Sequence, residues 1–166
     1  MLNKKICMVG AFAVGKTSLV KQFVEGIFDE KYHTTIGVKI DKKVIEKDSE
    51  SNTVQLMIWD IEGVDVFTNL KPTYLRGSSG IILVVDGTRR KTLEPAEEII
   101  SIIKEHLGNI PIVLLINKSD LETSWQFQIE DTLTLGIADS NIFKTSAKND
   151  NNVELAFERL VELISK

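Results

Sequence analysis

The segment from Gly10 to Thr17 carries the strongest chemical signal in the sequence. It reads Gly-Ala-Phe-Ala-Val-Gly-Lys-Thr and fits the pattern G-x-x-x-x-G-K-[ST]. Glycines let the backbone wrap closely around an anion, successive N–H groups donate to its oxygens, and the Lys16 ammonium reaches the terminal phosphates. The Thr17 hydroxyl can bind a Mg²⁺ ion that bridges those phosphates. A glycine-rich turn with a surface lysine is the alternative, but a strand before and a helix after favour a phosphate loop.

A second motif, Asn117-Lys118-Ser119-Asp120, addresses the base, which the phosphate loop alone does not select. The Asp120 carboxylate can accept the N1 and 2-amino N–H groups of guanine, whereas adenine offers no such donor pair and leaves the carboxylate unpaired. We expect Asn117 to tie this loop to the phosphate loop and the Lys118 stem to lie over the base. Taken alone, these four residues fit an ordinary capping turn equally well.

A third motif, Thr145-Ser146-Ala147-Lys148, follows the last strand candidate. Its backbone N–H groups can face the guanine O6 from the other side of the base. Because the three motifs occur in this order, the sequence indicates a guanine-nucleotide site.

The elements that must position these motifs follow from the hydrophobic pattern. Short apolar runs alternate with segments of helical period, which is typical of an α/β fold with a mostly parallel sheet and helices on both faces. The six predicted strands cover residues 5–9, 38–46, 54–60, 80–86, 111–117 and 141–144. The polar connection 47–52 predicts one hairpin. Apolar stripes predict a helix that begins near Lys16, one through residues 99–107 and one through 153–164.

The composition limits the classes of protein that the chain can represent. Its 166 residues, 43% of them apolar, predict one domain spanning residues 1–166. A net charge of −4 argues against a nucleic-acid-binding face. Cys7 is the only cysteine, so a disulfide framework is excluded and a reducing compartment is expected. No run of about 18 apolar residues, prenylation cysteine or N-terminal glycine occurs, so we expect a cytoplasmic monomer without a direct membrane anchor.

The three motifs and their spacing resemble those of Ras-superfamily small GTPases, particularly the Rab-like group, over essentially the whole chain. The resemblance implies a P-loop NTPase fold and a switch that binds GTP or GDP with Mg²⁺ and hydrolyses GTP. It implies catalytic roles for Lys16, Thr35 and Gly63, and Mg²⁺ contacts from Thr17, Thr35 and, through water, Asp60. The implied nucleotide-binding residues are Ala13, Val14, Gly15, Lys16, Thr17, Ser18, Phe28, Tyr32, Thr35, Gly63, Asn117, Lys118, Asp120, Ser146, Ala147 and Lys148.

The resemblance also implies protein partners. Effectors and exchange or activating proteins would bind the switch segments around residues 29–38 and 61–76, which relax when Thr35 and Gly63 lose the γ-phosphate. Phe12 is bulky at a position that is often small and is expected to hinder an arginine supplied by an activating partner. We read residues 89–91, Arg-Arg-Lys, as a solvated basic turn.

Two residues depart from the family pattern beside the phosphate site. Val64 stands where the family usually carries the glutamine that orients the attacking water, and valine makes no hydrogen bond through its side chain. Glu62 stands where the family usually has a small alanine, so we expect it either to repel GTP or to take over a polar role, which includes a role in catalysis. Asp65 is expected to face solvent. Hydrolysis is therefore expected to be slow, and the alternative is a hydrolysis-deficient, GTP-bound interaction module.

Overall fold

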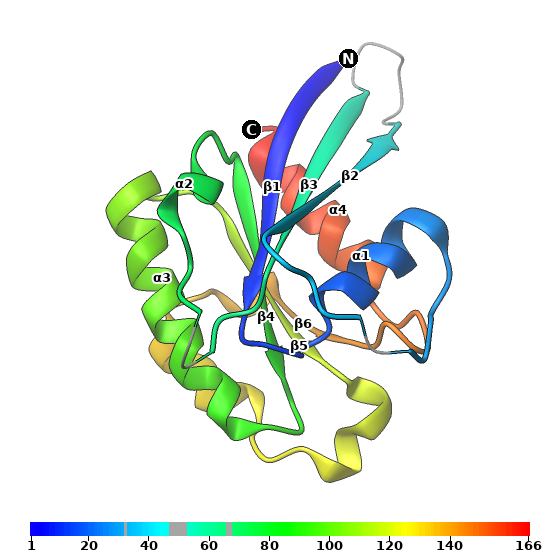
Figure 1. Cartoon of the computed structure of the whole chain (residues 1–166), viewed down its shortest axis with the longest axis vertical. Helices are drawn as coiled ribbons and strands as arrows, with labels where there is room; N and C mark the ends of the chain where they lie inside the picture. The colour runs from blue at the N-terminus through cyan, green and yellow to red at the C-terminus, as the bar shows by residue number, and fades with distance from the viewer. Residues whose placement is uncertain (32, 47–52, 66–67) are drawn as a thin grey trace.

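A six-stranded sheet forms the centre of the fold in the computed structural model, which describes residues 1–31, 33–46, 53–65 and 68–166. The strand order is β2-β3-β1-β4-β5-β6 (Figure 1). Only the β2–β3 pair is antiparallel, and the other neighbours run parallel. The strands are β1 (Leu2–Gly10), β2 (Val38–Ile45), β3 (Val54–Ile61), β4 (Gly80–Asp86), β5 (Ile112–Asn117) and β6 (Ile142–Thr145). The predicted mostly parallel sheet is thus confirmed; residues 47–52 between β2 and β3 lie outside the described residues.

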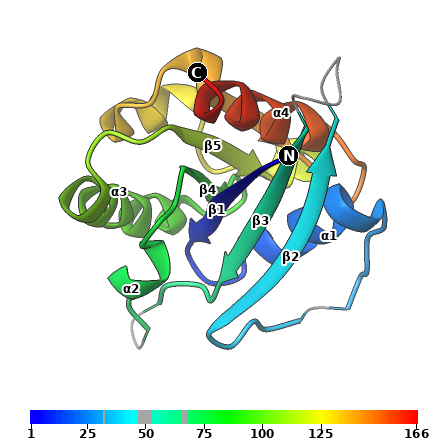
Figure 2. The same cartoon turned by 90° about the horizontal axis from the view of Figure 1, so that it is seen from above.

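Helices cover both faces of the sheet, as predicted. Seen from above, α1 (Lys16–Glu25) and α4 (Val153–Ile164) lie on one side, and α2 (Pro72–Leu75) and α3 (Leu93–Leu107) on the other (Figure 2). The three predicted helices correspond to α1, α3 and α4. The single turn of α2 was not predicted, because four residues are too few to show a helical period.

Two hydrophobic cores result, one on each face. The central strands β4 and β5 are continuous apolar runs because both of their faces are covered. Side chains alternate along a strand, so Ile82 packs with the α1 and α4 core and its neighbour Leu83 with the α3 core. Phe23 of α1 stacks on Phe157 of α4 with ring centroids 3.9 Å apart, which joins these helices.

The connection between β5 and β6 differs from a regular crossover helix. It consists of the short 3₁₀ helices η3 (Ser119–Ser124), η4 (Ile129–Leu135) and η5 (Asp139–Asn141). Phe127 and Leu135 anchor it to the α3 core. Within the described part of the chain, no helix has the length and apolar character needed to cross a membrane.

The sheet determines where the sequence motifs meet. Gly10, Asp86, Asn117 and Thr145 are the last residues of β1, β4, β5 and β6. Because these strands are parallel, their carboxyl ends share one edge of the sheet, where α/β folds bind ligands. The phosphate-loop, base and third motifs all begin at this edge.

Candidate functional site

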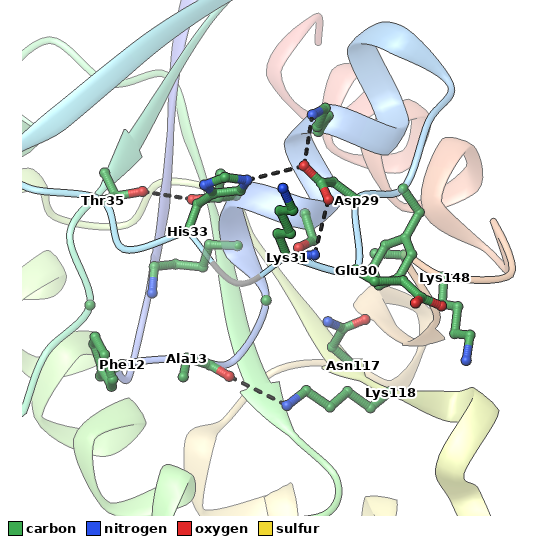
Figure 3. A pocket seen from close by; sticks show the side chains of 18 of the residues that line it. Phe12, Ala13, Asp29, Glu30, Lys31, His33, Thr35, Asn117, Lys118 and Lys148 are labelled. Atoms are coloured by element: carbon green, nitrogen blue, oxygen red, sulfur yellow. Dashed lines mark hydrogen bonds and ion pairs between the residues drawn. The ribbon is translucent and has the colours of Figure 1, made fainter.

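A cleft of about 410 Å³ opens at the carboxyl edge of the sheet (Figure 3). This volume is in the range of small-molecule sites. The predicted site residues that line it are Ala13, Gly15, Lys16, Thr17, Ser18, Phe28, Thr35, Gly63, Asn117, Lys118, Asp120, Ala147 and Lys148. Segments that are distant in sequence therefore contribute to one continuous site.

The phosphate loop runs from the end of β1 to the first turn of α1. Gly15 has φ +101°, which L side chains rarely adopt, and a Cβ there would lie 2.4 Å from the Asn117 Nδ2 atom. A side chain at this position would therefore push the loop away from the base motif. The loop ends at the N-terminus of α1, where backbone N–H groups without helical acceptors favour an anion.

Lys16 is almost completely buried at the bottom of this loop. Its Nζ donates to the Gly10 and Ala11 carbonyl oxygens at 3.3 and 3.0 Å. Burial lowers the pKa of Lys16 to about 8, the charge of Asp60 partly opposes this decrease, and the charge of Arg89 adds to it. A phosphate beside the ammonium would favour its charged form, so the environment suits an anionic ligand.

Three side chains with oxygen atoms meet beside Lys16. The Thr17 hydroxyl lies 2.7 Å from the Thr35 hydroxyl and donates to Asp60 Oδ2 at 2.6 Å. Asp60 Oδ1 is buried and has no hydrogen-bond partner among the described residues. Burial raises the pKa of Asp60, against the Thr17 hydrogen bond and the charge of Lys16, which lower it. A hard cation that prefers oxygen ligands would satisfy this orphaned carboxylate oxygen, so the group fits Mg²⁺.

The base end of the cleft is cross-linked by side chains. Asn117 Nδ2 donates to the Val14 carbonyl at 3.0 Å, which connects the base motif to the phosphate loop. The Ser146 hydroxyl donates to Asp120 Oδ1 at 2.8 Å and so orients that carboxylate. Phe28 lines the cleft and is 36% exposed, which leaves part of its side chain accessible to a planar base.

Val14 and Ser146 do not line the cleft with the other predicted residues. The Val14 side chain is buried in the core, although its backbone belongs to the phosphate loop, and Tyr32 is outside the described residues. The Ser146 N–H donates to the Asn151 carbonyl at 3.1 Å in an isolated bridge. This N–H is therefore already paired, whereas the Ser146 hydroxyl contacts Asp120; Ala147 and Lys148 line the cleft at that point.

Glu62 and Val64, which depart from the family pattern, do not line the cleft, although Gly63 between them does. The Phe12 N–H donates to the Val64 carbonyl at 2.9 Å, and the Val64 side chain packs against the α3 core. A Cβ on Gly63 would lie 2.5 Å from the Phe12 Cα atom, so only glycine permits this approach. The Glu62 carboxylate accepts the Gly37 N–H at 3.0 Å, and Asp65 Oδ1 accepts the Thr68 N–H at 2.8 Å.

Sequence reasoning missed Asp86 and misread Arg89. Asp86 is completely buried at the end of β4 and accepts Arg89 Nε at 2.9 Å and Lys118 Nζ at 2.8 Å. Arg89 Nη2 also donates to the Phe12 carbonyl at 2.8 Å, so the expected solvated basic turn is wrong for this residue. The sequence did offer a signal for Asp86, because a carboxylate that ends a continuous apolar strand is buried and needs a charged or hydrogen-bonding partner.

Comparison with known proteins agrees with this geometry. The family model described as "Ras family" matches residues 5–166. Ras-related protein Rab-13 of Canis lupus familiaris is 37% identical over 158 residues, covering 94% of this chain and 77% of the relative. Ras-related protein Rab-7b of Mus musculus is 37% identical over 166 residues, with 96% and 81% covered. Ras-related protein SEC4 of Saccharomyces cerevisiae is 35% identical over 163 residues, with 98% and 75% covered. The chain therefore belongs to the Ras family of GTP-binding switch GTPases and is similar, within that family, to Rab proteins.

Proposed function

We propose that residues 1–166 form a single G domain that binds GTP or GDP with Mg²⁺ in the cleft and hydrolyses GTP slowly. The observation that carries this proposal is that Lys16 and Asp120 line the same cleft. One supplies a buried ammonium for phosphates, and the other supplies a carboxylate that matches the guanine donors.

Each residue has a distinct task in this proposal. Lys16 neutralises the terminal phosphates, and the Gly63 N–H donates to the γ-phosphate. Thr17 and Thr35 would hold Mg²⁺ directly and Asp60 through water, and the ion would neutralise charge that develops on the phosphates. Effectors and exchange or activating proteins would recognise the segments around residues 29–38 and 61–76.

Slow hydrolysis follows from what surrounds the γ-phosphate position. The Val64 side chain is directed to the α3 core, and valine cannot hold a water by a hydrogen bond. The Glu62 carboxylate, the nearest polar replacement, accepts the Gly37 N–H instead. Neither side chain lines the cleft, so the attacking water lacks a positioning group from these two residues.

These two contacts favour a second candidate function. A chain that holds GTP without turnover would act as a GTP-bound interaction module, because its switch segments would stay in one state. The two functions differ in whether bound GTP is converted to GDP with time.

Single-turnover hydrolysis separates the two functions. The purified protein would be loaded with GTP and Mg²⁺, and its conversion to GDP followed for the wild type, Val64→Gln and Glu62→Ala. We expect slow conversion in the wild type and acceleration by at least about tenfold in Val64→Gln, since one positioned hydrogen bond contributes that much or more. Glu62→Ala should leave the rate within about twofold, because this carboxylate contacts Gly37.

Three other outcomes would change the assignment. Complete retention of GTP over many hours supports the interaction module. A wild-type rate that Val64→Gln leaves unchanged contradicts the proposed cause of slow turnover. Loss of turnover in Glu62→Ala assigns the catalytic role to Glu62.

A further inference from the structure

Asp86 connects two cations at the outer side of the phosphate loop. Its Oδ2 accepts Arg89 Nε and Lys118 Nζ, and its Oδ1 accepts the Thr88 N–H and hydroxyl at 2.9 and 2.7 Å. Burial raises the pKa of Asp86, but the hydrogen bonds from Lys118, Thr88 and Arg89 outweigh it and lower the pKa below its ordinary value. The carboxylate is therefore a fixed anion at neutral pH, although it is buried.

The two cations reach from this anion to consecutive carbonyls of the phosphate loop. Arg89 Nη2 donates to the Phe12 carbonyl at 2.8 Å, and Lys118 Nζ donates to the Ala13 carbonyl at 3.4 Å (Figure 3 shows the second contact). Asn117 Nδ2 holds the next carbonyl, that of Val14. The carbonyl oxygens of three successive residues thus accept hydrogen bonds from side chains.

The orientation of these carbonyls sets the orientation of the opposite N–H groups. In a planar trans peptide the C=O and the following N–H point in opposite directions. When Arg89 holds the Phe12 carbonyl, the Ala13 N–H must therefore point away from Arg89, and Ala13 lines the cleft. The same argument directs the Val14 and Gly15 N–H groups away from Lys118 and Asn117.

Arg89 acts on the first of these peptides and does not line the cleft itself. We propose that Arg89, anchored by Asp86, is a positioning residue that holds the Phe12–Ala13 peptide so that the Ala13 N–H donates to the phosphates of a bound nucleotide. This inference rests on the proposed function, because it assumes that a guanine nucleotide occupies the cleft. It adds a contact from the β4–α3 connection to the determinants of nucleotide affinity.

Dissociation of a fluorescent GDP analogue in Mg²⁺ tests the inference. Arg89→Gln should accelerate dissociation by about tenfold, because a charge-assisted hydrogen bond that orients a phosphate donor is lost. Arg89→Lys retains the charge but offers one nitrogen in place of Nε and Nη2, which contact Asp86 and the Phe12 carbonyl separately, so an intermediate rate is expected. The matched control is Arg90→Gln, since Arg90 pairs with Asp131 on the surface; its rate should equal that of the wild type.

Two further readouts separate positioning from a general loss of stability. The amide resonance of Ala13 should shift less on GDP binding in Arg89→Gln than in the wild type, whereas that of Ser18, in the first turn of α1, should shift equally. Arg89→Gln removes a partner of the buried Asp86 and should by itself lower the melting temperature of the nucleotide-free protein. Each variant is therefore compared with its own nucleotide-free form, and the increase caused by GDP should be smaller in Arg89→Gln than in Arg90→Gln.

The results distinguish failure of the inference from failure of the proposed function. A wild type that retains no guanine nucleotide overturns the proposed function and the inference with it. If the wild type binds GDP and the nucleotide dissociates at the same rate from Arg89→Gln, Arg89→Lys and Arg90→Gln, only the positioning role is overturned. If Arg89→Gln does not fold, the comparison of Arg89→Lys with Arg90→Gln decides: equal rates overturn the inference.

Discussion

Glu62 introduces a negative charge next to Gly63 of the phosphate site, yet the residue makes two hydrogen bonds to Gly37. Its carboxylate accepts the Gly37 N–H at 3.0 Å, and its own N–H donates to the Gly37 carbonyl at 2.8 Å. Gly37 lies in the first of the two proposed switch segments and Glu62 in the second. Glu62, for which repulsion of GTP was one expected effect, therefore links the two segments in the structure.

Hydrogen exchange of the Gly37 amide checks this link. Glu62→Ala should reduce its protection by about tenfold, because the amide loses a charged acceptor. Glu62→Gln, which retains a carbonyl oxygen, should give an intermediate value. Asp65→Ala is the control, because Asp65 accepts the Thr68 N–H; it should leave Gly37 unchanged. Equal Gly37 exchange in the wild type and Glu62→Ala would contradict the link.

Among the elements, α1 and α4 determine where the phosphate loop lies. The stacked rings of Phe23 and Phe157 join the two helices, and Phe157 is completely buried. Since α1 begins at Lys16, a displacement of this helix moves the ammonium as well. The packing of α1 and α4 on one face of the sheet therefore positions Lys16 at the edge of the sheet.

Substitution of Phe157 measures this support. Phe157→Ala should lower the free energy of unfolding by about 3–5 kcal/mol, because it leaves a cavity and removes the ring stack. Leu155→Ala is the control on the same helix, since Leu155 is 55% exposed, and should change it by less than about 1 kcal/mol. Chemical denaturation of both variants provides the values. Similar losses in the two variants would show that the ring stack does not anchor α1.

The strands could be predicted from the sequence, whereas the connection that follows β5 could not. Continuous apolar runs such as Gly80–Asp86 identify strands covered on both faces. The segment from Ser119 to Leu135 lacks a helical period, so its 3₁₀ helices left no pattern to detect. The motifs located the cleft because their residues are contiguous. The link from Asp86 to Phe12 joins positions far apart in sequence, and only the fold brings them together.

At the scale of the molecule, the nucleotide site depends on contacts between separate elements. Thr17 belongs to α1, Thr35 to the first switch segment and Asp60 to β3, and hydrogen bonds join the three side chains. A ligand that contacts Thr35 and Gly63 through one phosphate would hold both switch segments, and its loss would release them. The surface offered to partners would then depend on the nucleotide.

Competition between nucleotides tests guanine specificity, the central claim of this account, most directly. Fluorescent GDP bound to the wild type and to Asp120→Asn would be displaced by GDP, ADP and xanthosine diphosphate. GDP should displace it from the wild type at a concentration at least about a thousandfold lower than ADP, because adenine leaves the Asp120 carboxylate unpaired. Asp120→Asn should instead prefer xanthosine diphosphate, whose 2-carbonyl accepts a hydrogen bond where guanine donates one. Equal displacement by GDP and ADP, or unchanged guanine preference in Asp120→Asn, would contradict the assignment of the base site.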